Sequence, residues 1–183
     1  MAAGMIRMTC LALPPPAALR RGILPRPSDP CDMALAGSLS WPEHVPIITS
    51  GADHPAVQAW SGRAVQPDDA LRDCDCGYWA GKALHDLPAD QVVQWLGDPA
   101  FAPPGGESRA AMFGRVTRWM AKVSHTHDHL VVAVRPAVVR AMVLVALGGT
   151  PAMESRLDIV PATRTMLVAR DHWRVQSVNV LPG

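Results

Sequence analysis

The sequence has almost no net charge and only two lysines, Lys82 and Lys122. Its 17 basic and 16 acidic residues are interspersed, so it lacks the field of one sign that draws a protein to nucleic acid or to anionic lipid. The apolar stretch from Leu130 to Gly148 approaches membrane-spanning length, but Arg135 and Arg140 inside it are costly in hydrocarbon. We therefore expect no nucleic-acid partner and no membrane partner.

Cysteine is scarce as well. Four cysteines are too few for the disulfide framework of a small secreted protein, and the Cys74/Cys76 pair lacks a second pair that would complete a zinc site. The N-terminal stretch resembles an export signal only superficially, because its apolar run of about six residues is short and ends in three prolines. We expect a reduced, cytoplasmic protein that needs no cofactor.

The distribution of apolar residues predicts an α/β fold. Short β-branched runs alternate with longer stretches of helical periodicity, which is the pattern of a sheet covered by helices on both faces. A single domain over residues 1–183 is long enough to bury about 70% of the surface of its unfolded chain. The predicted strands are Arg7 to Leu13, Val45 to Ser50, His129 to Val134, Leu157 to Val160, Thr165 to Arg170 and Val175 to Val180.

Two segments predict helices that pack on this sheet. Apolar residues recur at three- and four-residue spacing from Met112 to Val123, which indicates a helix that begins near Ser108 and buries one face. Val138 to Leu147 is apolar on nearly all sides and predicts a more buried helix that ends at a Gly-Gly pair. The proline and glycine residues of "LGDPAFAPPGGES" predict a surface loop.

Three polar residues are candidates for a site at the carboxyl edge of the sheet. Arg135 stands between a predicted strand and a helix, where amide protons and the helix dipole favour anions. Its guanidinium can clamp a carboxylate or phosphate, or it can pair with an acid such as Asp73. His54 precedes Pro55 at a predicted helix start. It is either a catalytic acid or base, or a histidine that caps the helix or lies on the surface. Asp73 is either the hydrogen-bonding partner of His54 or a turn residue.

The segment "SHTHDHL" brings His125, His127 and His129 together. Alternation along a strand would place the three rings on one face, as a divalent metal requires. The cluster lies in a short connection between helix and strand, at the edge opposite Arg135, and a solvated loop is the favoured interpretation. We expect no metal site.

Four segments, taken in order, resemble the phosphoglycerate mutase-like histidine phosphatase family: "LRDCDCGYWAGKAL", "WLGDPAFAPPGGES", "VVAVRPAVVRAMVLVALGG" and "RLDIVPATRTMLV" with the following "HWRVQSVN". The resemblance covers about Leu71 to Asn179. It implies a three-layer α/β/α sandwich with a mostly parallel central sheet and a site at the carboxyl ends of the strands.

The same resemblance implies that every catalytic position of the family is altered here. The altered positions are Ala12, Leu13, Pro14, His54, Asp73 and Arg135. Leu13 stands where the family has the histidine that takes up the phosphoryl group, and Arg135 stands where it has the second catalytic histidine. His54 replaces a phosphate-binding arginine, and Asp73 replaces a glutamate. No histidine precedes His44, so no shift of the alignment restores the nucleophile.

These substitutions leave more than one function open. The leading hypothesis is a catalytically degenerate protein that binds an anionic small molecule or a protein partner in the old pocket or at its rim, because Leu13 cannot supply an imidazole. The alternative is a repurposed enzyme in which His54 and Asp73 form a hydrogen-bonded acid–base pair and Arg135 holds an anion or oxyanion. Residual phosphatase activity is a third hypothesis.

Tryptophan is abundant beside the other aromatic residues. Six tryptophans accompany only two phenylalanines and one tyrosine. Exposed tryptophans can anchor an interface, so a homodimer is possible; packing in the core is the other interpretation.

Overall fold

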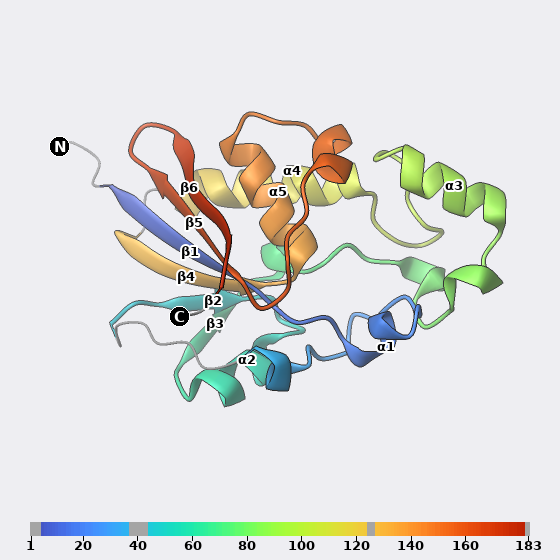
Figure 1. Cartoon of the computed structure of the whole chain (residues 1–183), viewed down its shortest axis with the longest axis horizontal. Coiled ribbons are helices and arrows are strands. Elements are labelled where there is room, and N and C mark those ends of the chain that lie inside the picture. Colours follow the sequence, from blue (N-terminus) through green and yellow to red (C-terminus); the bar gives the residue numbers. More distant parts are fainter. Residues whose placement is uncertain (1–4, 37–43, 124–126, 182–183) are drawn as a thin grey trace.

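The computed structural model describes residues 5–36, 44–123 and 127–181, and its centre is a mixed β-sheet (Figure 1). The strands are β1 Ile6–Ala12, β2 Ile47–Thr49, β3 Val65–Pro67, β4 His129–Val134, β5 Arg164–Ala169 and β6 Trp173–Val180. Within the described chain their order is β3-β2-β4-β1-β5-β6. The first four in this order pair in parallel, whereas β5 is antiparallel to both of its neighbours. The predicted α/β fold class is confirmed.

Helices cover both faces of the sheet (Figure 1). On one face lie α4 (Arg109–Val123) and α5 (Pro136–Ala146), and on the other lies α2 (His54–Ser61). The short α1 (Ala17–Arg20) and α3 (Ala89–Gly97) lie beyond the carboxyl ends of the parallel strands. Brief 3-10 segments occupy Met33–Leu35, Asp69–Leu71, Gly77–Trp79, Leu84–Asp86 and Pro151–Arg156. Among the described residues, no helix combines the length and apolarity that crossing a membrane requires.

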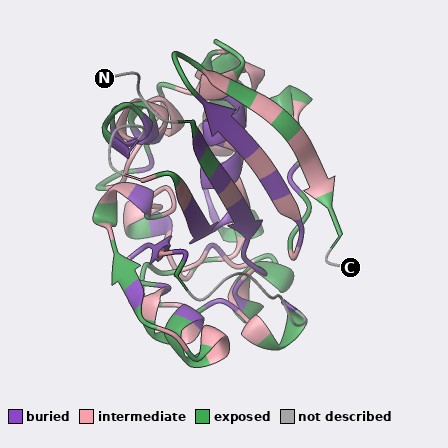
Figure 2. Cartoon of the chain, turned by 90° about the vertical axis from the view of Figure 1, so that its left-hand side faces the viewer, coloured by how far each residue is buried: buried purple, intermediate pink, exposed green. Residues whose placement is uncertain are grey.

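Strand β4 is buried on both faces, which explains its continuous apolar sequence. Leu130 and Val132 belong to the larger core, under α4 and α5, while Val131 and Ala133 belong to the core on the α2 side. This alternation follows from the two-residue period of a strand. Figure 2 shows the buried residues gathered in the central strands, whereas β6 at the edge carries exposed and half-buried ones.

The two helix predictions are confirmed. Helix α4 buries one stripe, made of Met112, Val116, Trp119, Met120 and Val123. In α5 six of the eleven residues are buried, as expected of a segment that is apolar nearly all round. Gly148 follows α5 with a φ of 68°, a left-handed conformation that suits glycine at a helix end.

Two details of the strand prediction were wrong. Leu157 to Val160 is not a strand, because the side chain of Asn179 accepts a hydrogen bond from Val160 N and donates one to Asp158 O, in place of a neighbouring strand. Strand β3 was not predicted, since it has three residues and only Val65 is buried.

The tryptophans of the described chain lie in or against the core. Trp79 and Trp119 are buried, and Trp60, Trp95 and Trp173 are half-buried. Trp79 packs edge-on against Trp95, with ring centroids 5.8 Å apart, in a small cluster that holds α3. Trp41 lies outside the described residues. The homodimer stays a prediction.

The two-sided core makes a direct prediction for Leu130, which is fully buried in β4. Leu130→Ala should lower the free energy of unfolding by about 2–5 kcal/mol, because it leaves a cavity between packed layers. The matched control is Leu96→Ala on α3, where the side chain is 64% exposed, and it should cost about 0.5 kcal/mol or less. Urea denaturation measures both, and equal costs would contradict this description of the core.

Candidate functional site

A pocket of about 360 Å³ opens at the carboxyl ends of the parallel strands, the usual place for ligands in such sheets. It forms there because β2 and β4 are neighbours, so that the turn after β2 and the start of α5 lie side by side. Two further segments complete the walls, one proline-rich and one following the 3-10 turn at Asp69–Leu71. The lining residues are Pro25, Arg26, Pro27, Ser50, Ala52, Asp53, Asp69, Arg72, Asp73, Cys74, Asp75, Cys76 and Arg135.

Arg135 forms a buried ion pair with Asp53. Nη2 of Arg135 lies 3.0 Å from Oδ1 of Asp53, and Nε lies 3.3 Å from each carboxylate oxygen. The two side chains are 6% and 1% exposed. Burial acts to lower the pKa of Arg135, but the hydrogen bonds and charge of Asp53 outweigh it and raise that pKa above its ordinary value. The arginine is thus a permanent cation with a fixed partner.

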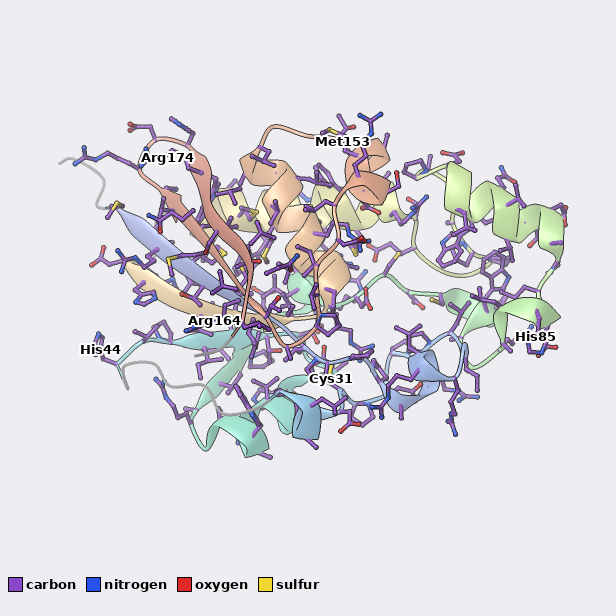
Figure 3. All side chains as sticks on the ribbon, in the orientation of Figure 1. Cys31, His44, His85, Met153, Arg164 and Arg174 are labelled. Carbon is purple, nitrogen blue, oxygen red and sulfur yellow. The ribbon has the colours of Figure 1, made fainter. Side chains whose placement is uncertain are left out.

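Other donors complete the coordination of the Asp53 carboxylate. Ser50 Oγ donates to Oδ2 at 2.8 Å, and Cys31 Sγ donates to Oδ1 at 3.0 Å. Cys31 is labelled in Figure 3, at this end of the sheet. Arg135 Nη2 also donates to the backbone oxygen of Asp29 at 2.6 Å, which ties the proline-rich segment to the end of β4. A buried ion pair is tolerated when its remaining hydrogen-bonding groups are satisfied in this way.

Asp73 lies in the same pocket, but it is not the partner of Arg135. Its Oδ1 accepts a hydrogen bond of 2.8 Å from the amide of Cys74, and no ion pair joins it to Arg135 among the described residues. Burial raises the pKa of Asp73, against the lowering effect of the nearby Arg135 charge. Arg135 therefore pairs with an acid, as expected, but that acid is Asp53 and not Asp73.

His54 is turned away from the pocket. Its Nε2 lies 3.0 Å from the backbone oxygen of Val65 in β3, and His54 is not among the lining residues. No hydrogen bond joins His54 to Asp73 in the described chain, so the repurposed acid–base pair lacks the contact that it requires. The preceding residue, Asp53, faces the pocket instead.

The end of β1 contributes apolar packing. Ala12, Leu13 and Pro14 are buried, and none of them lines the pocket. Leu13 is fully buried in the core on the α2 side, and its amide donates to the backbone oxygen of Val134 at 2.8 Å. The position that the family resemblance assigns to a nucleophile therefore holds a core side chain.

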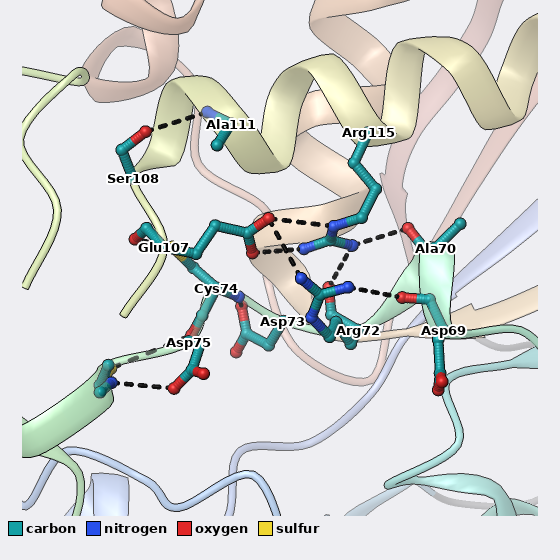
Figure 4. A network of polar contacts seen from close by, with 12 residues as sticks. Asp69, Ala70, Arg72, Asp73, Cys74, Asp75, Glu107, Ser108, Ala111 and Arg115 are labelled. Atoms are coloured by element: carbon teal, nitrogen blue, oxygen red, sulfur yellow. Dashed lines mark hydrogen bonds and ion pairs between the residues drawn. The ribbon is translucent and has the colours of Figure 1, made fainter. Parts of the chain in front are cut away.

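A second polar network supports one wall of the pocket (Figure 4). Arg115 donates to both carboxylate oxygens of Glu107, from Nε at 3.2 Å and from Nη2 at 2.7 Å. Its Nη1 donates to the backbone oxygens of Ala70 and Arg72, at 2.7 and 3.0 Å. The network fixes the segment that leads to Asp73 against the start of α4.

Sequence reasoning missed Ser50, Asp53, Glu107 and Arg115. Each had a signal in the sequence. Ser50 and Asp53 are three residues apart between a strand and a helix, a spacing typical of helix starts. Glu107 and Arg115 are eight residues apart around the beginning of a helix, which brings them to the same side.

The pocket cysteines are thiols rather than nucleophiles. Burial raises the pKa of Cys76 to about 11 and that of Cys74 to about 12. A thiolate is the nucleophilic form, so neither sulfur is activated at neutral pH.

No metal-binding group of three or more His, Cys, Asp or Glu residues occurs within the described residues. His125 lies outside them. His129 begins β4 at the end of the sheet opposite the pocket, with Nε2 3.5 Å from Thr9 Oγ1, and burial lowers its pKa. Figure 3 places His44 and His85 at opposite ends of the molecule.

Comparison with known proteins identifies the family. Residues 55–181 match the profile of the histidine phosphatase superfamily, branch 1. The chain belongs to this superfamily. The family resemblance noted in the sequence is thereby confirmed, and a comparison with curated protein sequences gives no match.

Several solved structures of phosphatases share this fold. A mycobacterial glucosyl-3-phosphoglycerate phosphatase has a TM-score of 0.75 and 20% identity, over 96% of this chain and 99% of its own. A putative alpha-ribazole-5'-P phosphatase from Escherichia coli has a TM-score of 0.80 and 16% identity, over 96% and 98%. The alpha-ribazole phosphatase from Shigella flexneri has a TM-score of 0.78 and 15% identity, over 96% of this chain and 98% of its own. At these identities the likeness shows a common fold.

The buried ion pair makes the first prediction for the site. Asp53→Asn should lower the free energy of unfolding by about 3–5 kcal/mol, because it leaves the Arg135 charge buried without a partner. The double variant Asp53→Asn/Arg135→Gln should recover part of that loss. As a control, Asp32→Asn breaks the exposed Arg20–Asp32 pair of 2.7 Å and should cost about 1 kcal/mol or less. Similar costs in urea denaturation for the two single variants would contradict a buried pair.

Asp73 makes a pH-dependent prediction. Because the pKa of Asp73 is raised in the folded state, the folded protein holds the proton of this carboxyl group more tightly than the unfolded chain does. The contribution of Asp73 to stability should therefore fall as the pH rises from the ordinary pKa of aspartate through the raised one. Asp73→Asn should gain stability relative to the wild type over that window, measured by urea unfolding from acid to neutral pH. A difference between the two proteins that does not change with pH would contradict the raised pKa.

Proposed function

We propose that this chain is a catalytically degenerate member of the histidine phosphatase superfamily. In this proposal the pocket binds a small molecule through an anionic group, a carboxylate or a phosphate, and no phosphohistidine forms. The observation that carries the proposal is the composition of the pocket. Among the described residues no histidine lines it, and Arg135, at the position of a catalytic histidine in the family resemblance, is held by Asp53.

The chemistry of phosphoryl transfer supports the loss of catalysis. Transfer to histidine needs an unprotonated ring nitrogen in line with phosphorus, and cations on the remaining phosphoryl oxygens. Leu13 has no lone pair and is fully buried. Arg135 cannot act as a proton shuttle at neutral pH, and most of its charge is neutralised by Asp53.

The same arginine retains one free donor. Its Nε and Nη2 are bonded to Asp53 and to the backbone of Asp29, while Nη1 has no hydrogen-bond partner in the described chain. Arg135 lines the pocket, so an anionic group of a ligand can accept a charge-assisted hydrogen bond from Nη1. Arg26 and Arg72 supply further positive charge on the walls.

Turnover of p-nitrophenyl phosphate tests the loss of catalysis. We expect none above the rate in buffer. Measurable turnover that disappears in His54→Ala would contradict degeneracy and would favour residual phosphatase activity.

Thermal unfolding with carboxylate and phosphate compounds tests binding. A ligand at a free concentration of about one hundred times its Kd should raise the free energy of unfolding of the wild type by about 2.7 kcal/mol. The matched control is Arg135→Lys, which keeps a cation beside Asp53 but removes Nη1, and its ligand-dependent stabilisation should be smaller. If no anionic compound stabilises the wild type, the small-molecule proposal fails and a protein partner becomes the favoured hypothesis.

A further inference from the structure

The charges around the pocket do not suit a purely anionic ligand. The lining carries four carboxylates and three guanidinium groups, those of Asp53, Asp69, Asp73, Asp75, Arg26, Arg72 and Arg135. Two of these charges cancel in the Arg135–Asp53 pair. Arg72 is partly engaged by Glu107, since its Nη2 lies 3.4 Å from Oε1 of that residue, outside the lining. Three carboxylates, those of Asp69, Asp73 and Asp75, then remain beside only two guanidinium groups, those of Arg26 and Arg72.

These three carboxylates have no ion pair in the described chain. Asp73 and Asp75 each accept one backbone amide at 2.8 Å, and the second oxygen of each carboxylate has no described partner. The Asp69 carboxylate lies against Gly51, where an added Cβ would be 2.8 Å from Oδ1. In Figure 4 the three carboxylates point away from Arg115. All three residues line the pocket.

Arg135 supplies the opposite kind of group to the same pocket. Its side chain is only 6% exposed, yet Nη1 has no described hydrogen-bond partner. Nη1 is not one of the fully buried side-chain atoms without a partner in the described chain, so a ligand in the pocket can reach it and supply an acceptor. One pocket thus holds a donor that lacks an acceptor and carboxylates that lack a cation.

We propose that the ligand is a zwitterion of amino-acid size, with its carboxylate at Arg135 Nη1 and its ammonium group among Asp69, Asp73 and Asp75. This inference rests on the proposed function and narrows it. A phosphate group would add up to two negative charges beside carboxylates that have no counter-ion, whereas an ammonium group supplies the missing cation. A volume of about 360 Å³ is at the small end of ligand pockets, which suits a ligand of this size.

Isothermal titration with probes of matched length tests the proposal. The probes are ω-amino acids from glycine to 6-aminohexanoate, together with the amine and the carboxylate of the same chain length, and inorganic phosphate. We expect at least one amino acid to bind about tenfold or more tightly than its amine and its carboxylate alone.

The outcomes separate the two proposals. If carboxylates or phosphate bind as tightly as the amino acids, the zwitterion inference is overturned and the proposed function stands. If amines alone bind as tightly, the anionic contact of the proposed function is wrong and the zwitterion inference fails with it. If no probe binds, both fail.

Variants of the acidic wall give a second readout. Asp73→Asn should weaken the affinity for the best-binding amino acid about tenfold and leave the affinity for its carboxylate analogue unchanged or improved. The control Asp90→Asn, on exposed α3, should change neither affinity. An ammonium group beside Asp73 also lowers the pKa that burial raises, so binding should release protons at any pH at which the ligand-free protein still holds the Asp73 carboxyl proton. Titrations in two buffers of different ionisation enthalpy detect this release, and equal losses for both analogues would contradict the proposed orientation.

Discussion

The pocket end of this molecule depends on the ion pair between Arg135 and Asp53. The pair joins the end of β4 to the turn that precedes α2, and through the backbone of Asp29 it also holds the proline-rich segment. Such a pair is stable when buried only because Ser50 and Cys31 satisfy the remaining lone pairs of the carboxylate. Two nitrogens of Arg135 thus hold the structure of the site together, and only Nη1 remains to bind a ligand.

Much of the fold could be predicted from the sequence, because strong periodicity predicts long elements. The continuous apolar run of β4 is typical of a strand covered on both faces, and the stripe from Met112 to Val123 is typical of a helix that packs with one face. Short elements could not be predicted in the same way. Strand β3 has one buried residue. In place of the strand expected at Leu157 to Val160, the side chain of Asn179, which is distant in sequence, accepts a hydrogen bond from Val160 N and donates one to Asp158 O.

The site could be predicted only as far as its position. Arg135 and Asp73 do line one pocket, because both follow elements that end at the same edge of the sheet. The direction of a side chain at a helix start is harder to predict, since each step along a helix turns the side chain by about 100°. Asp53 therefore faces Arg135 while His54 faces Val65, although the two are adjacent in sequence.

Our central proposal, that this member of the histidine phosphatase superfamily forms no phosphohistidine, rests on the composition of its pocket. The most direct measurement is the intact mass of the protein after incubation with p-nitrophenyl phosphate and quenching at alkaline pH, where phosphohistidine survives. The account predicts only the unmodified mass. A phosphorylated species that maps to any histidine of the chain would contradict it.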